Sequence, residues 1–247
     1  MYGSHESPAW LELAIAPAAA RRVSLPRVPH ATPFLPYVML SASPRSGLAH
    51  LRRADPILAA LIARVGPYRL QPRRTGTHYD ALVRSIVYQQ LSGKAAGTIL
   101  RRFCELYPGK RPTAALVLGT DEALMRGAGL SRQKLGYLRD LSSRVASGTL
   151  PLAHLGRLPD DAIIEHLVQV KGIGKWTAQM FLMFRLGRPD VLPDLDLGIQ
   201  NAIHKAYGLK ARPTPKDVLR IGERWRPHAT MASWYLWRSL ENGDGQL

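Results

Sequence analysis

The chain has 247 residues, with 34 Lys and Arg against 18 Asp and Glu, so its net charge at pH 7 is +16 and its isoelectric point is near 10.5. Cys104 is the single cysteine, which excludes a disulfide framework and an iron–sulfur cluster held by four cysteines of this chain. The histidines show no close pair at metal-ligand spacing, so no metal site is expected.

The excess of basic residues predicts a phosphate-rich partner. A basic protein can bind nucleic acid or an anionic membrane surface. No apolar run approaches the roughly 18 residues that span a bilayer, and the basic residues are dispersed rather than gathered on one amphipathic helix. DNA is therefore the expected partner, and a membrane is not.

Residues 1–45 differ in character from the rest of the chain. They contain seven prolines and no sustained apolar period, which predicts an irregular N-terminal extension. Their short apolar run from Trp10 to Ala20 lacks a basic start, so no secretory signal is expected. Residues 46–247 are expected to form one domain.

That domain carries repeated helix signals without the alternation typical of strands. Four positions combine a capping residue with a helical pattern after it: Asp55-Pro56, Thr120-Asp121-Glu122, Ser131 and Thr214-Pro215. These signals predict about nine helices and an all-α fold.

Residues 160–187 have the pattern of two helices joined by a glycine turn. Apolar residues recur at helical spacing after Pro159, and a second helix is expected from Lys175 to about Leu186. Gly172 and Gly174 allow a tight turn with a bare backbone. The pattern is that of a helix-hairpin-helix, and a glycine-capped helix corner is the alternative.

The turn is a candidate binding site for a phosphate. Backbone N–H groups at a helix N-terminus attract anions, and here two lysines flank them. The predicted contacts to the DNA backbone are Lys171, Gly172, Gly174, Lys175 and Thr177.

An acidic pair follows the hairpin in the sequence LPDLDLGIQ. Helical spacing resumes at Ile199, so Asp196 lies at a helix entrance, where the helix dipole favours a negative charge. A carboxylate beside a sugar stabilises the positive charge that develops as a base departs. Asp196 could instead only cap its helix, and so could Asp194.

Together these residues resemble the helix-hairpin-helix DNA glycosylases, and within them the alkylated-base group of the 3-methyladenine DNA glycosylase II type, over roughly residues 51–241. The resemblance implies two helical lobes with a DNA-binding cleft between them. The family's catalytic aspartate, about twenty residues beyond Trp176, corresponds to Asp196 rather than Asp194. The chain looks like the compact form of the family, without an N-terminal β domain.

The resemblance also implies that the DNA strand is not cut. Strand-cutting relatives use a lysine nucleophile at the second residue of the second hairpin helix, where this chain has Trp176. Lys175 is adjacent, but a shift of one residue turns a side chain by about 100° around the helix. Water is therefore the expected nucleophile, and core packing is the alternative role of Trp176.

A helix corner lies upstream of the hairpin. Thr77 and Asp80 predict a capping box at the start of one helix, and Ser92-Gly93 breaks it, so Leu91 falls at a corner between two helices. In the resembling family an apolar side chain there fills the gap that a flipped nucleotide leaves, and Gln90 could bond the orphaned partner base. Leu91 could instead be the last buried residue of its helix.

Three of the five tryptophans lie near the C-terminus. Trp225 and Trp234 are expected to pack in the core. Trp237 matches the family position that presents an aromatic face to the flipped base, and a cationic base gains about 0.5–2 kcal/mol over such a face. Met180 stands where the best-known member of the family has an aromatic residue, which leaves the breadth of the base pocket open.

The implied function is a monofunctional DNA glycosylase that flips alkylated purines of the 3-methyladenine and 7-methylguanine class and leaves an abasic site for base excision repair. No cofactor is required, although family members can hold a monovalent cation on hairpin carbonyls. The expected protein is a monomer on double-stranded DNA with alkylated bases, in the cytoplasm at the nucleoid or in the nucleus. Two alternatives are a non-catalytic DNA-binding module and a glycosylase for another lesion, such as mispaired uracil.

Overall fold

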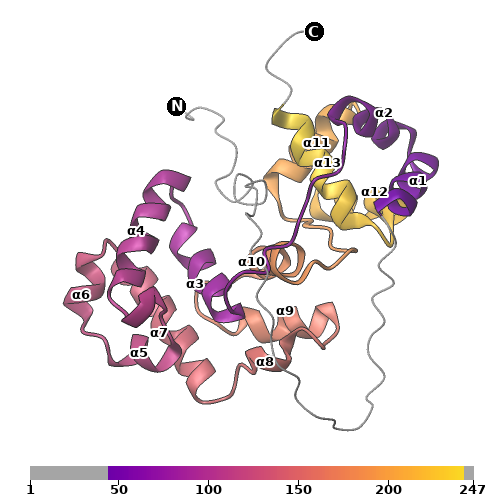
Figure 1. Cartoon of the computed structure of the whole chain (residues 1–247). Helices are drawn as coiled ribbons and strands as arrows, with labels where there is room; N and C mark the ends of the chain where they lie inside the picture. Colours follow the sequence, from indigo (N-terminus) through magenta and orange to yellow (C-terminus); the bar gives the residue numbers. More distant parts are fainter. Residues whose placement is uncertain (1–43, 242–247) are drawn as a thin grey trace, which may run out of the picture.

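The computed structural model describes residues 44–241, and within them the chain forms helices and no strands (Figure 1). The α-helices are α1 (Pro44–Ala54), α2 (Pro56–Val65), α3 (His78–Tyr88), α4 (Gly93–Glu105), α5 (Ala114–Gly119), α6 (Glu122–Gly127), α7 (Arg132–Ala146), α8 (Leu152–Leu155), α9 (Asp160–Val168), α10 (Lys175–Phe181), α11 (Leu197–Ala206), α12 (Pro215–Gly222) and α13 (Ala229–Glu241). The predicted all-α class is confirmed. The extension predicted for residues 1–45 falls almost wholly outside the described residues, and its boundary stays a prediction.

Side-chain caps begin the helices where the sequence predicts them. Asp55 accepts hydrogen bonds from two amides in the first turn of α2. Thr77 and Asp80 form the expected capping box at the start of α3, and Ser131 caps α7. These caps satisfy N–H groups that have no partner within the helix.

The prediction of about nine helices was too low, because the described residues contain thirteen α-helices. The additional ones include α5, with six residues, and α8, with four. Such short helices hold too few residues to show a repeating apolar period. The second hairpin helix also changes form, since α10 passes into a π-helical turn over Leu182–Leu186.

The helices form two lobes on either side of α10 (Figure 1). In one lobe α7 packs against α3, α5 and α6. In the other, α13 packs against α2 and α11. The helices α9 and α10 pack against each other, and α10 also contacts α3. The expected two-lobed architecture is confirmed, and the hairpin lies at the junction of the lobes.

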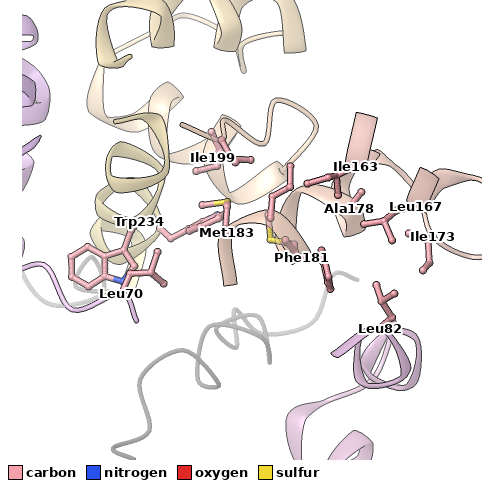
Figure 2. Packing of buried hydrophobic residues seen from close by; sticks show 14 of the residues in the cluster. Leu70, Leu82, Ile163, Leu167, Ile173, Ala178, Phe181, Met183, Ile199 and Trp234 are labelled. Atoms are coloured by element: carbon pink, nitrogen blue, oxygen red, sulfur yellow. The ribbon is translucent and has the colours of Figure 1, made fainter. Parts of the chain in front are cut away.

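One apolar core joins the two lobes. Figure 2 shows Phe181 and Met183, from the second hairpin helix and its π-helical turn, between Leu82 of α3 and Trp234 of α13. All four side chains are buried. Because protein interiors pack as densely as organic crystals, this shared core fixes the hairpin relative to both lobes.

The segment that runs between the lobes, residues 66–77, is fastened to the π-helical turn. The guanidinium of Arg185 donates to His78 Nδ1 at 3.1 Å and to three backbone carbonyls between Arg73 and Gly76. The backbone N–H of Arg73 donates in turn to the carbonyl of Phe184 at 2.7 Å. The Arg185 side chain therefore binds the connecting segment, whereas the ring of the neighbouring Phe184 lies at the candidate site.

Candidate active site and DNA interface

The two hairpin glycines differ in backbone conformation and in the space around them. Gly172 has φ of +81°, which favours glycine, and a Cβ there would lie 2.2 Å from Cδ2 of Tyr137. Gly174 has φ of −93° and open space where a Cβ would be. Gly172 is therefore needed by the turn and by the ring packed against it, whereas Gly174 leaves the backbone uncovered.

The backbone amides of the turn are not all open, contrary to the sequence-based prediction. The N–H of Lys171 donates to Asp140 Oδ2 at 2.9 Å, and the N–H of Ile173 donates within the turn. Asp140 lies 31 residues earlier in the chain, so no local pattern indicates this bond. The side chain of Lys171, on an exposed residue, remains the group that can reach a phosphate.

Two other predicted phosphate contacts are also constrained. Lys175 Nζ forms an ion pair with Asp194 at 2.8 Å, with 43% of the lysine side chain exposed. Thr177 is buried, so its hydroxyl does not lie on the hairpin surface. Only its backbone amide, in the first turn of α10, keeps the position that the prediction requires.

Asp196 lies where the sequence predicts, at the entrance of α11. Its Oδ1 accepts hydrogen bonds from the amide of Ile199 at 2.8 Å and from Trp237 Nε1 at 2.9 Å. Its Oδ2 accepts from Trp176 Nε1 at 2.7 Å. The carboxyl group therefore caps the helix and is also held between two indoles that come from α10 and α13. Only 7% of the residue is exposed.

All three partners of Asp196 are N–H donors, so both of its oxygens act as acceptors. This is the hydrogen-bonding pattern of an ionised carboxylate. Three of its roughly four lone-pair positions are occupied, which leaves room for about one further donor, such as a water molecule.

The second acidic residue has a different environment. Asp194 is buried and pairs with Lys175, and Gln179 Nε2 donates to it at 3.3 Å. Its backbone carbonyl accepts from Gln200 Nε2 at 3.0 Å. Asp194 thus connects the segment before α11 to α10, and unlike Asp196 it forms an ion pair with a lysine.

An aromatic cluster surrounds the carboxylate. Trp237 is 3% exposed and stacks on Phe184, with ring centroids 6.0 Å apart and planes 29° apart. The indole is therefore covered in this structure, and its contact with a flipped base stays a prediction. Phe184, which the sequence reading missed, covers that indole, and Trp176 is half-buried beside the shared carboxylate. Met180 is buried.

Gly198 provides the space for this arrangement. A Cβ at Gly198 would lie 2.9 Å from Asp196 Oδ1 and 3.2 Å from Trp237 Cδ1. Because Gly198 has no side chain, the Trp237 indole can approach the Asp196 carboxylate across its backbone. The only sequence signal for this role is the place of Gly198, two residues after the aspartate.

The helix corner of residues 89–92, here called the wedge turn, joins α3 to α4 as predicted. Leu91 is half-buried, Gln90 is exposed with φ of +57°, and Ser92 caps α4. Gln89, which the sequence reading also missed, donates from Nε2 to the carbonyl of Gly172 at 2.8 Å. The structure therefore brings the wedge turn against the hairpin.

The remaining predicted core residues behave as expected. Trp225 and Trp234 are buried, and Trp225 Nε1 donates to Asp55 at 2.9 Å.

Residues 44–241 contain no group of three or more His, Cys, Asp or Glu that could hold a metal ion. No helix in that range has the length and apolar character needed to cross a membrane.

Comparison with known proteins identifies the family. The family model described as HhH-GPD superfamily base excision DNA repair protein matches residues 83–227. DNA-3-methyladenine glycosylase 1 of Schizosaccharomyces pombe is 36% identical over 200 residues, which cover 79% of this chain and 87% of that protein.

Solved structures agree with this match. The S. pombe 3-methyladenine DNA glycosylase in complex with abasic DNA superposes with a TM-score of 0.71 at 34% identity, covering 81% of this chain and 99% of that one. A DNA-3-methyladenine glycosidase from Bacillus halodurans also gives 0.71 at 34% identity, covering 79% and 89%. The chain belongs to the HhH-GPD superfamily of base excision DNA repair proteins.

Proposed function

We propose that this protein is a monofunctional DNA glycosylase that flips alkylated purines of the 3-methyladenine and 7-methylguanine class out of duplex DNA and hydrolyses their N-glycosidic bond. The observation that carries the proposal is the Asp196 carboxylate, held by two indole N–H groups beside a glycine hairpin. The relatives named as 3-methyladenine DNA glycosylases support the substrate class.

The carboxylate stabilises the positive charge of the transition state. As the base departs, positive charge develops on the sugar, much as in glycoside hydrolysis. At about 4 Å and an effective dielectric near 20, an anion stabilises that charge by about 4 kcal/mol, which corresponds to about a thousandfold in rate. Three hydrogen bonds hold Asp196 in place, so little reorganisation is needed during the reaction.

The nucleophile is water rather than an amine of the protein. Trp176 occupies the position of the lysine nucleophile in strand-cutting relatives, and its indole is bonded to Asp196. The neighbouring Lys175 is paired with Asp194. The remaining acceptor position on the Asp196 carboxylate can orient the attacking water, and the product is an intact strand with an abasic site.

Selectivity for alkylated bases comes from the leaving group and from the aromatic cluster. A cationic base over an indole gains about 0.5–2 kcal/mol, which alone is too little to find rare lesions. An alkylated purine already carries positive charge and departs without a general acid. Because Phe184 covers Trp237, a base that stacks on Trp237 requires Phe184 to move, whereas Trp176 is partly exposed already.

The hairpin and the net charge of +16 support binding to the phosphates of double-stranded DNA. The proposed contacts are the side chains of Lys171 and Lys175 and the amides of Gly172, Gly174 and Thr177. Leu91 fills the gap left by the flipped nucleotide, and Gln90 contacts the orphaned base. We propose that the protein acts as a monomer in the nucleoid or nucleus and requires no cofactor; a monovalent cation on the hairpin carbonyls is part of the same proposal.

The test is to incubate the purified protein with methylated duplex DNA and to identify the released bases by mass spectrometry. We expect 3-methyladenine and 7-methylguanine, together with abasic sites in strands that are cut only after alkali treatment. Tight DNA binding without release would leave a non-catalytic binding module. Release from a duplex with mispaired uracil, and not from methylated DNA, would assign another lesion.

A further inference from the structure

One side of α7 contacts both the wedge turn and the hairpin. At its first turn, Lys134 Nζ donates to the carbonyls of Val87 and Gln89, each at 2.7 Å. Carbonyls at the end of a helix such as α3 lack donors within the helix. The lysine therefore satisfies carbonyls at the C-terminal end of α3, where the wedge turn begins. Its partial burial lowers the pKa of its ammonium group.

The next two turns of α7 contact the hairpin. Tyr137 lies with its ring against Gly172, where a Cβ would be 2.2 Å from the ring. Asp140 accepts from the amide of Lys171 at 2.9 Å, and Arg144 holds that carboxylate at 2.9 Å. The spacing of three residues keeps Lys134, Tyr137 and Asp140 along one side of the helix.

Gln89 completes a closed set of contacts. Its backbone carbonyl accepts from Lys134, and its side chain donates to the carbonyl of Gly172 at 2.8 Å. The wedge turn, the hairpin and α7 are thus each bonded to the other two. Such a closed arrangement fixes a distance, because one member cannot move without breaking a bond to another.

We propose that α7 is a brace that holds the wedge turn at a fixed distance from the hairpin, with Lys134 and Asp140 as positioning residues. The proposal rests on the proposed function, in which Leu91 enters the duplex while the hairpin holds its backbone. If the distance is fixed, holding the backbone places Leu91 at the base to be flipped. Loosening the brace should therefore impair base flipping more than DNA binding.

The test measures flipping and binding separately. A duplex with 2-aminopurine next to a 7-methylguanine reports flipping by its fluorescence, and an undamaged duplex reports affinity. The variants are Lys134→Met and Asp140→Leu, which remove the donor and the acceptor of the brace, and Lys110→Met is the matched control, because Lys110 is an exposed lysine of the same lobe paired only with Glu105 in the described contacts. Thermal melts check that each variant is folded.

We expect both brace variants to lower the fluorescence rise and the single-turnover rate of base release by about tenfold to a hundredfold. Their affinity for undamaged duplex should match that of Lys110→Met within about twofold. Lys134→Arg should restore most of the flipping, since a guanidinium can also donate to two carbonyls. Leu91→Ala should lower flipping in the wild-type protein and have little added effect in Lys134→Met.

The outcomes separate the two proposals. Wild-type flipping without base release would overturn the proposed enzyme while leaving the brace testable by fluorescence. A wild-type protein that neither flips nor releases a base overturns both. If Lys134→Met and Asp140→Leu are folded and flip the base as well as the wild type does, the brace alone is overturned. An undiminished effect of Leu91→Ala in Lys134→Met overturns it as well.

Discussion

At the scale of single residues, the two aspartates of LPDLDLGIQ differ in what surrounds them. Asp194 is bonded to a cation and Asp196 to neutral indole N–H groups. An ion pair already balances a negative charge, whereas neutral donors hold a carboxylate in place and leave its charge to act on a substrate. This difference supports Asp196 as the group that faces the sugar.

Gly198 offers a test of how Trp237 positions that carboxylate. Gly198→Ala places a methyl group 2.9 Å from Asp196 Oδ1 and 3.2 Å from Trp237 Cδ1, so the carboxylate must shift and the indole must move slightly with it. We expect the single-turnover rate of base release to fall about tenfold to a hundredfold, with DNA affinity unchanged.

The control for Gly198→Ala is Gly136→Ala in α7, where a Cβ meets open space. That variant should stabilise the protein by about 0.5–1 kcal/mol and leave the rate unchanged. A wild-type rate in Gly198→Ala would show that the exact placement of the Asp196 carboxylate against Trp237 has no part in the reaction.

Sequence alone predicted the position of Asp196 and its helix entrance, but not its partners. The bonds from Trp176 and Trp237 span 20 and 41 residues, and the bond from Lys171 to Asp140 spans 31. Local patterns record periodicity and caps, whereas these contacts depend on how distant helices pack. For the same reason the sequence did not indicate that Phe184 covers Trp237.

At the scale of helices and turns, the caps explain why the element starts were predictable. Asp55, Thr77 and Ser131 each bond amides within three residues of themselves, so their signal is contained in the local sequence. The π-helical turn after α10 was not predicted. At its end the amides of Gly187 and Arg188 both donate to the carbonyl of Leu182, and Arg185 makes contacts to residues more than 100 positions earlier in the chain.

The hairpin glycines should respond differently to the same substitution. Gly172→Ala puts a methyl group at φ of +81° and into the ring of Tyr137. We expect a loss of about 2–4 kcal/mol in the free energy of unfolding, from the combined conformational cost and overpacking. Gly174→Ala, with a negative φ and open space, should fold normally and bind duplex DNA more weakly.

Urea denaturation and DNA titration at one salt concentration measure the two effects. The salt must be fixed, because affinity for phosphates depends strongly on it. Equal stabilities of the two variants would contradict the role assigned to Gly172. Unaltered DNA binding by Gly174→Ala would show that phosphates do not approach the hairpin at that position.

At the scale of the whole molecule, two histidines link stability to pH. Burial lowers the pKa of His78 and of His228, and the nearby Arg185 and His50 respectively lower it further. His78 Nδ1 also accepts a bond from Arg185, which a protonated ring could not do. Each folded histidine therefore binds fewer protons than its unfolded counterpart, whose pKa is about 6.5.

The sign of the effect follows from proton linkage. Where the unfolded chain binds more protons, stability rises with pH. The free energy of unfolding should therefore fall as the pH drops from about 7.5 to about 5.5. The double variant His78→Gln, His228→Gln should show a flatter profile in denaturation experiments at these pH values. A wild-type profile that is flat, or that rises on acidification, would contradict this account.

The two lobes share one core with α10 at its centre, so the hairpin, the wedge turn and Asp196 belong to one rigid arrangement rather than to separate modules. The resemblance in sequence already implied the lobes, and the family match confirms them. The coupling between the hairpin and the wedge turn through α7 became visible only in three dimensions.

The most direct test of the central claim compares Asp196→Asn with Asp194→Asn on one duplex that contains 7-methylguanine. Single-turnover rates are measured at saturating protein, with DNA affinity and thermal stability determined for each variant. We predict that Asp196→Asn releases the base about a thousandfold more slowly than the wild type, and that Asp194→Asn stays within about tenfold of it. Base release by Asp196→Asn at the wild-type rate, or an equal loss in both variants, would contradict the assignment of Asp196 as the catalytic carboxylate.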